Sequence, residues 1–275
     1  MDRRPGVFRN RFRLDIRRMR FSGVIAVALL IVGSAFAAEI PPPDRRSGYD
    51  FMKPDTKAMQ DEDTANPGML WVLDGEGLWK RKLGAANKAC ADCHDDARTS
   101  MKGVAAQYPA FDKATGRPVD LEQRINSCRS NHQQATPLPF ESRELLALTA
   151  FIARQSQGAA IETGADPQLA PFIARGRELY MQRQGQLNLG CANCHDDNWD
   201  KRLAGSAVTQ AHPTGYPLYR LEWQSLGSLQ RRLRACITGI RAQAYDYGAP
   251  ELVELELYLM SRAKGMPMEA PAVRP

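Results

Sequence analysis

The sequence predicts a mainly α-helical chain that contains two tandem units related by internal duplication. Apolar residues recur with helical period, as in Leu145, Leu148 and Ile152, and no run alternates apolar and polar residues for long enough to indicate a sheet. Four blocks of sequence occur twice in the same order. With 275 residues, 43% hydrophobic and 25% charged, the chain has room for about two globular domains and is too apolar for intrinsic disorder.

Residues 1–37 are typical of a signal peptide. They contain eight Arg and two Asp, then an uncharged apolar run from Gly23 to Phe36, and end in the small-x-small site Ala35-Phe36-Ala37. A membrane anchor is the alternative, but a span needs about 20 apolar residues and this run is shorter. We expect cleavage near Ala37 or Ala38 and export to the periplasm, with no membrane span left after cleavage.

The formal net charge of +6 comes entirely from the surplus of arginine in this leader. Without residues 1–37 the chain carries as many acidic as basic residues, which argues against a nucleic-acid binder. Residues 38–67 are rich in Pro and charge and are expected to form an extended arm. The low-periodicity stretch 155–167 places a boundary near Gly164, so the predicted domains are 68–163 and 164–275.

The duplication has a defined register. Residues 90–96 return 101 positions later as 191–197, with only Asp92 changed, to Asn193. Beyond the motif, the second unit carries its matched residues 108 or 107 positions after those of the first. The matched positions are Gly75, Leu78, Trp79 and Asn87 with Gly176, Leu179, Tyr180 and Asn188; Leu121, Arg124 and Cys128 with Leu229, Arg232 and Cys236; and Glu144, Leu145, Leu148 and Ile152 with Glu251, Leu252, Leu255 and Leu259.

The first repeated block is a C-x-x-C-H motif, which is the attachment signal of a c-type haem. The two thiols form thioethers with the haem vinyl groups and the adjacent histidine binds the iron. A zinc site or a disulfide framework is the alternative, but two copies on an exported chain favour haem. We therefore expect two class I-like cytochrome c domains with two covalently bound c-type haems, attached through Cys90, Cys93 and His94 and through Cys191, Cys194 and His195.

Each iron then needs a distal ligand, and the ordinary choice is methionine. Candidates by position are Met101 for the first haem and the three methionines 260, 266 and 268 for the second, yet none is repeated between the units. Cys128 and Cys236 are repeated, 34 and 41 residues after the motif histidines. We interpret both as thiolate ligands; the alternatives are a disulfide between them or two buried apolar cysteines.

Other aromatic and histidine residues have less specific patterns. His132 or His212 could complete a bis-histidine haem, but neither is duplicated in register, so each is expected at the surface or beside the ligands. The four tryptophans are expected to pack against haem or core; they are Trp71, Trp79, Trp199 and Trp223.

Cys236 has the surroundings of a nucleophile. Arg232 precedes it by one helical turn, and a positive charge on the same helix face favours the reactive thiolate. Arg232, or Arg241, could also hold an anionic substrate with a forked guanidinium. Arg231 and Arg234 are expected on the solvated face.

These residues resemble the SoxA family, the diheme subunits of SoxAX cytochrome complexes in sulfur oxidation. The likeness covers the exported chain and is most specific from Arg232 through Cys236 and Arg241 to Tyr245 and the final helix. It implies an L-cysteine S-thiosulfotransferase, which couples thiosulfate to a cysteine of the SoxYZ carrier and passes two electrons to a soluble cytochrome c. It also implies a heterodimer with the monohaem cytochrome SoxX.

The resemblance further implies the roles of single residues. His94 and Cys128 would be the axial ligands of haem 1, and His195 and Cys236 those of haem 2. Cys236 would be the catalytic residue, carried as a persulfide, and Arg232 would bind substrate. A diheme electron-transfer cytochrome is the alternative function, and a diheme peroxidase would need an iron with an open distal position.

Overall fold

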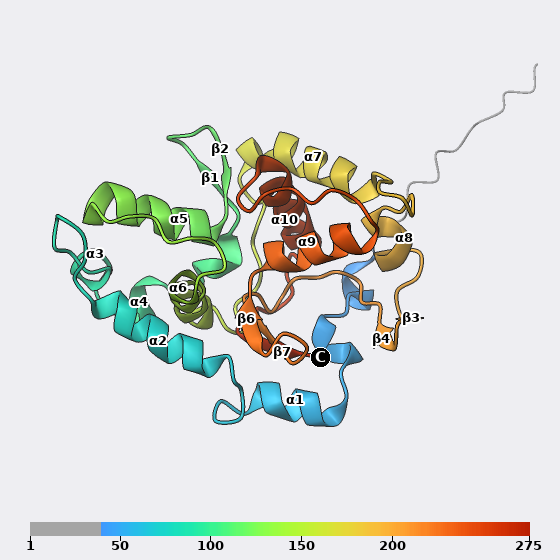
Figure 1. The fold of residues 1–275 in the computed structure, drawn as a ribbon, viewed down its shortest axis with the longest axis horizontal. Helices are drawn as coiled ribbons and strands as arrows, with labels where there is room; N and C mark the ends of the chain where they lie inside the picture. Colours follow the sequence, from blue (N-terminus) through green and yellow to red (C-terminus); the bar gives the residue numbers. More distant parts are fainter. Residues whose placement is uncertain (1–39) are drawn as a thin grey trace, which may run out of the picture. The chain divides into compact units, whose positions relative to one another are not determined.

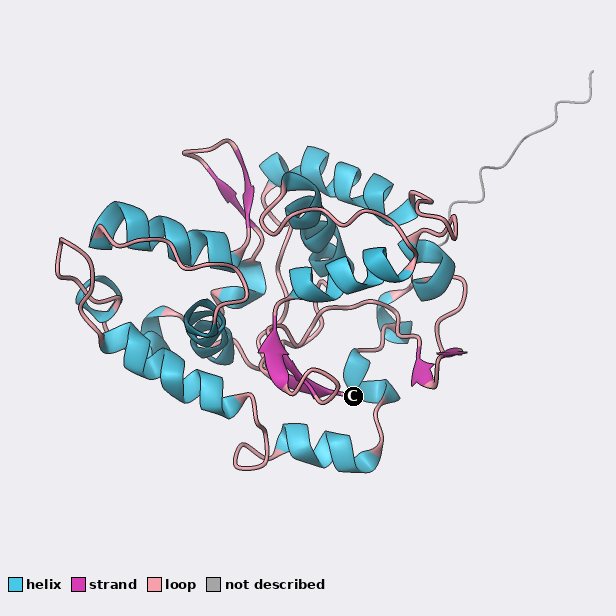
Figure 2. Ribbon diagram, viewed as in Figure 1, coloured by secondary structure: helices cyan, strands magenta, loops and turns pink. Residues whose placement is uncertain are grey.

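The computed structural model describes residues 40–275 and is mainly helical, as the sequence predicts (Figure 1, Figure 2). The predicted signal peptide and its cleavage site lie outside the described residues. Among residues 40–275 no helix has the length and apolar character needed to cross a membrane.

The two predicted units contain equivalent elements in the same order, which confirms the duplication. Each has a first helix, a short helix with the C-x-x-C-H motif, a β-hairpin, a helix with the second cysteine and a final helix. In the first unit these are α2 (Met69–Lys80), α3 (Ala91–His94), β1 (Ala110–Asp112), β2 (Arg117–Val119), α5 (Leu121–Cys128) and α6 (Arg143–Arg154), with α4 (Ala97–Ser100) after the motif. In the second they are α7 (Ala170–Met181), α8 (Cys191–His195), β5 (Leu218–Arg220), β6 (Ser225–Gly227), α9 (Leu229–Gly239) and α10 (Pro250–Arg262).

The first and last helices of each unit cross closely at a glycine. A Cβ atom on Gly75 in α2 would overlap the carbonyl oxygen of Ala147 in α6, and one on Gly176 in α7 would overlap that of Glu254 in α10. Any side chain would therefore push the helices apart. This explains why both glycines appear in the repeat.

The hairpins escaped detection in the sequence because their strands are only three residues long. Their registers are identical: Asp112 pairs with Arg117 in the first unit, and Arg220 pairs with Ser225 in the second. The second hairpin gains a third, parallel strand, β7 (Ala272–Arg274). A further two-stranded pair, β3 (Arg202–Leu203) and β4 (Ser206–Ala207), follows the second motif.

Two clusters of buried apolar side chains form the core, one around each helix pair. The first also takes in side chains from the second unit, among them Tyr219 and Leu226, so the units share packing across the proposed division near Gly164. The four methionines considered as iron ligands all belong to this first cluster or pack against it, which gives them a core role; they are Met101, Met260, Met266 and Met268.

Residues 40–67 contain helical elements, where the composition of 38–67 indicates an extended arm. Pro54–Asp61 forms helix α1, with proline in its first turn, where the missing N–H costs nothing. Two 3₁₀ turns precede it, η1 (Pro42–Asp44) and η2 (Gly48–Phe51). The composition does not reveal these elements because short helical turns between prolines leave little periodic pattern in the sequence.

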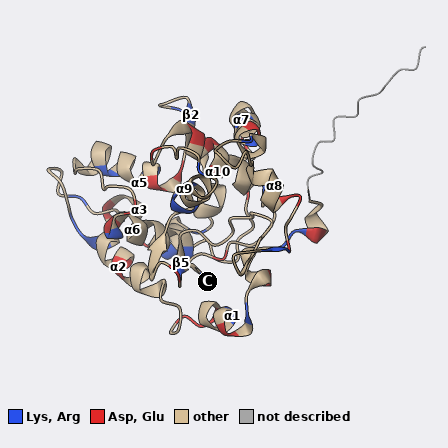
Figure 3. Ribbon diagram, turned by 45° about the vertical axis from the view of Figure 1, so that its right-hand side comes forward, with Lys and Arg blue, Asp and Glu red and all other residues tan. Residues whose placement is uncertain are grey.

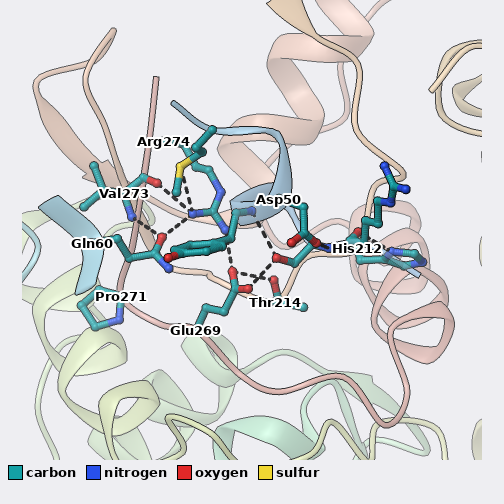
Figure 4. A network of polar contacts seen from close by, with 12 residues as sticks. Asp50, Gln60, His212, Thr214, Glu269, Pro271, Val273 and Arg274 are labelled. Carbon is teal, nitrogen blue, oxygen red and sulfur yellow. Dashed lines mark hydrogen bonds and ion pairs between the residues drawn. The ribbon is translucent and has the colours of Figure 1, made fainter. Parts of the chain in front are cut away.

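Polar contacts fasten this segment to the end of the chain (Figure 4). Arg274 forms an ion pair with Glu269 at 2.6 Å and also donates to the Gln60 side chain. Gln60 accepts a second hydrogen bond, from the backbone N–H of Val273 at 3.1 Å, and Thr214 donates to Glu269 at 3.0 Å. Helix α1 is thereby tied to strand β7 and to the second unit.

Candidate functional site

The second C-x-x-C-H motif occupies one short helix, α8, which places both cysteines and the histidine within about one turn. The Asn193 side chain closes the helix start by accepting from the N–H of Gly190 at 2.9 Å. The Nδ1–H of His195 donates to the carbonyl oxygen of Thr209 at 2.6 Å. Since this bond occupies Nδ1, Nε2 is the ring nitrogen that remains to bind an iron.

Cys236 in α9 lies against that imidazole. Burial alone would raise the pKa of the Cys236 thiol, but a hydrogen bond with His195 and the charges of Arg232 and Arg220 outweigh it and lower the pKa. The thiolate, which is both the metal-binding and the nucleophilic form, is therefore favoured. The structure thus brings together His195, Cys236 and Arg232 as the sequence predicts.

Arg232 is half-buried one turn before Cys236, and among residues 40–275 it forms no ion pair. Arg241, the other candidate for substrate binding, is exposed. The remaining arginines of α9 are engaged elsewhere: Arg231 lies 4.2 Å from the centre of the Trp223 ring, and Arg234 stacks on an aromatic ring too. Arg232 therefore remains the available cation nearest the sulfur along α9.

The first motif is more open to solvent. Cys93 and His94 are exposed, and the Trp79 ring lies 5.8 Å from the His94 ring. Trp79 is buried and donates its indole N–H to the carbonyl oxygen of Asp95 at 3.0 Å. This tryptophan orients the chain that follows the motif.

Cys128, the last residue of α5, lies near the motif cysteines. Burial raises the pKa of Cys128, the charge of Arg124 only partly offsets this, and the nearby Cys93 raises it further. The Arg124 guanidinium is itself bound to the carboxylate of Asp112 at 2.9 Å. Cys128 therefore lies near the motif of its own unit but lacks the thiolate-stabilising surroundings of Cys236.

The structure decides between some alternatives for the other candidates. All six cysteines are free, so a Cys128–Cys236 disulfide is excluded. His132 is exposed, within a π-helical turn at 129–133, as expected for a surface residue. His212 is not at the surface, because it is buried and its Nδ1 lies 2.9 Å from the carbonyl oxygen of Arg46, in the N-terminal segment.

Two residues of this site, Tyr216 and Arg220, are not among those predicted from the sequence. Burial raises the pKa of Tyr216 to about 12, and the charges of Arg232 and Cys236 both act on its hydroxyl. A signal was present, because Tyr108-Pro109 recurs as Tyr216-Pro217 at the same offset of 108 as the distal cysteines. Extending the repeat backward from the cysteines would have included both tyrosines and both hairpins.

This donor set fits a c-type haem. In the second unit, two thiols and an imidazole from one helical turn stand opposite a second-helix sulfur, and no disulfide competes for any of them. The imidazole is already held by the Thr209 carbonyl in the tautomer that leaves Nε2 for iron.

Comparisons with known proteins agree with this chemistry. A family model described as "SoxA/TsdA, cytochrome c domain" matches residues 74–161 and 175–268, which confirms the two predicted cytochrome c domains and implies c-type haem. The chain is 40% identical to the L-cysteine S-thiosulfotransferase subunit SoxA of Pseudaminobacter salicylatoxidans, over 83% of this chain and 80% of that protein. The protein of the same name from Rhodovulum sulfidophilum is 36% identical over the same shares. A crystal structure of SoxXA from P. pantotrophus superimposes with a TM-score of 0.81 at 31% identity, covering 84% of this chain and 87% of that one.

Proposed function

The chain belongs to the SoxA/TsdA cytochrome c family and is a subunit of an L-cysteine S-thiosulfotransferase, and we propose that Cys236 is its nucleophile. The observation that carries this assignment is the surroundings of Cys236, where His195 and Arg232 lower the pKa of a buried thiol. The repeated cysteine of the first unit, Cys128, has its pKa raised. The two cysteines occupy equivalent positions, but only at Cys236 do the surroundings shift the pKa of the thiol toward the thiolate.

Each domain carries one covalent haem in this proposal. Cys90 and Cys93 attach the first, with His94 and Cys128 as axial ligands. The matching set of the second is Cys191, Cys194, His195 and Cys236. A bound c-type haem supplies one-electron redox chemistry at each site.

The residues around Cys236 provide the steps of an oxidative coupling. Arg232 binds the sulfonate oxygens of thiosulfate and holds its outer sulfur beside Cys236. A sulfur–sulfur bond forms between Cys236 and that outer sulfur, and two electrons leave toward a soluble cytochrome c. The thiolate of the SoxYZ carrier cysteine then attacks the outer sulfur, so that the carrier S-thiosulfonate forms and the Cys236 thiolate is released.

The partners and location follow from the same family membership. We assign SoxX as the partner subunit in a heterodimer, SoxYZ as the protein substrate and thiosulfate as the small substrate. The reaction takes place in the periplasm, to which the leader at residues 1–37 would direct the chain.

The experiment compares Cys236→Ala with Cys128→Ala in the haem-loaded complex with SoxX. Mass spectrometry of the carrier follows addition of thiosulfate to its cysteine. We expect no adduct with Cys236→Ala and continued conjugation with Cys128→Ala. Conjugation at the wild-type rate by Cys236→Ala would refute the nucleophile. Loss of all conjugation in the wild-type complex, with both haems present and reducible, would instead indicate the alternative function, an electron-transfer cytochrome.

A further inference from the structure

The two β-hairpins carry opposite charges at one equivalent position. Asp112 ends β1 and Arg220 ends β5, exactly one repeat offset of 108 apart. Each hairpin leads directly into the helix that carries the distal cysteine, with Asp120 or Ser228 as its N-cap. The backbone therefore presents both side chains to the same place relative to the following helix.

In the first unit this place holds an acid that neutralises the helix arginine. Asp112 Oδ1 accepts a hydrogen bond from Arg124 Nη2 at 2.9 Å. A second oxygen of the same carboxylate accepts from the Thr115 hydroxyl at 2.7 Å, which fixes its orientation. The positive charge near Cys128 is thus compensated within the protein.

In the second unit the same place holds a second cation. Arg232, the equivalent of Arg124, has no acidic partner among the described residues, and Arg220 stands where Asp112 would be. Burial, and after it the charge of Arg232, lowers the pKa of Arg220, so the two guanidinium groups act on one another. Basic residues accordingly mark both β5 and α9 in Figure 3.

Arg220 is held firmly in this position. Its side chain is only 13% exposed, its Nη2 pairs with the carboxylate of Glu222 at 2.9 Å, and its Nε donates to the oxygen of Pro275 at 2.9 Å. Its guanidinium also lies 5.3 Å from the centre of the Trp223 ring. These contacts come from the hairpin and the chain end, so they restrict the side chain without supplying an acid to Arg232.

We propose that Arg220 and Arg232 together form the anion-binding pair that seats the sulfonate of thiosulfate beside Cys236, and that Asp112 denies the first unit such a site. Arg220 has one acidic partner, Glu222, and Arg232 has none among the described residues, so the two guanidinium groups keep a net positive charge that attracts a doubly charged anion. Forked guanidinium donors suit sulfonate oxygens. The inference rests on the proposed function, since it assigns the seat of that reaction's small substrate.

The test measures the Kd for thiosulfate by equilibrium dialysis of the haem-loaded complex, with neither carrier nor electron acceptor present. Arg220→Gln should raise the Kd about 10-fold or more, as expected for a lost charged hydrogen bond. Arg220→Lys, which keeps the charge without the fork, should recover part of the affinity. Arg220→Asp recreates the pair of the first unit and should bind at least as weakly as the glutamine variant.

The matched control is Asp112→Asn, which removes the equivalent acid of the first unit without supplying a second arginine there, and it should leave the Kd of the site beside Cys236 unchanged. An unchanged Kd in Arg220→Gln, or no recovery of affinity with lysine, would overturn the inference. That outcome is separate from failure of the proposed function, which is decided by the conjugation assay with Cys236→Ala.

Discussion

The two cytochrome units of this chain share a scaffold and differ in charge. Both cross their first and last helices at a glycine and place a distal cysteine after a hairpin of identical register. Around that cysteine the first unit pairs Arg124 with Asp112, whereas the second sets Arg220 beside an uncompensated Arg232. Duplication thus preserved the geometry that fits haem, and the chemistry diverged through a few side chains.

The units also differ in the contacts made by the residue that directly follows each C-x-x-C-H motif. In the second unit the Tyr180 hydroxyl donates to the Asp196 carboxylate at 2.8 Å, and the buried Arg262 pairs with the same carboxylate at 2.6 Å. In the first unit Trp79 donates to a backbone carbonyl at the equivalent place, and Gln155 stands where Arg262 would be. Among residues 40–275, a buried ion pair therefore supports the second motif but not the first.

Removal of that ion pair should produce the largest change in stability. Arg262→Ala leaves the Asp196 carboxylate buried and unpaired, which should lower the free energy of unfolding by about 3–5 kcal/mol. Urea unfolding of the haem-loaded protein measures it. The matched change in the first unit, Gln155→Ala, removes no charge and should have a much smaller effect. Equal losses in the two variants would mean that the ion pair does not distinguish the units.

A smaller change in the free energy of unfolding should appear with pH. It should distinguish the two histidines that the repeat does not match, His212 and His132. Burial lowers the pKa of His212 from 6.5 to about 4, so below pH 6.5 the unfolded chain takes up a proton that the folded chain does not. Stability from this group is therefore complete above pH 6.5, falls as the pH decreases, and levels off below about pH 4. At about 1.4 kcal/mol per pKa unit, the loss between pH 7 and 5 is about 2 kcal/mol.

The measurement is urea unfolding at both pH values for wild type, His212→Asn and His132→Asn. The His212 variant should lose this share of the pH dependence, because asparagine cannot titrate. The exposed His132 should be replaceable without changing it. If His212→Asn kept the full wild-type dependence, another group would be responsible.

Much of this architecture could be predicted from the sequence because the same pattern of residues occurs in both units. The repeat located both motifs and both distal cysteines, and one-turn spacing placed Arg232 beside Cys236. The prediction stopped where the units differ: Asp112 and Arg220 break the repeat, so a search for matched residues passes over them. The repeated residues predicted the scaffold. The position at which the two units differ, Asp112 in one and Arg220 in the other, indicates the proposed substrate site.

Other features depend on contacts between distant segments. The burial of His212 requires the N-terminal segment, whose Arg46 carbonyl lies against it. Met260 and Met268 follow the second motif in sequence, but they pack into the core cluster of the first unit. No local pattern encodes such long-range packing, and a strand of three residues, such as 218–220, is too short to show alternation.

The most direct test of divergence between the units is to remove the equivalent arginines one at a time. Arg232→Ala and Arg124→Ala would be compared in the haem-loaded complex by the initial rate of thiosulfate addition to the carrier cysteine. We expect the rate to fall about 10-fold or more with Arg232→Ala, as for a lost charged hydrogen bond, and to stay at the wild-type value with Arg124→Ala. Equal rates in the two variants would contradict the divergence of the units.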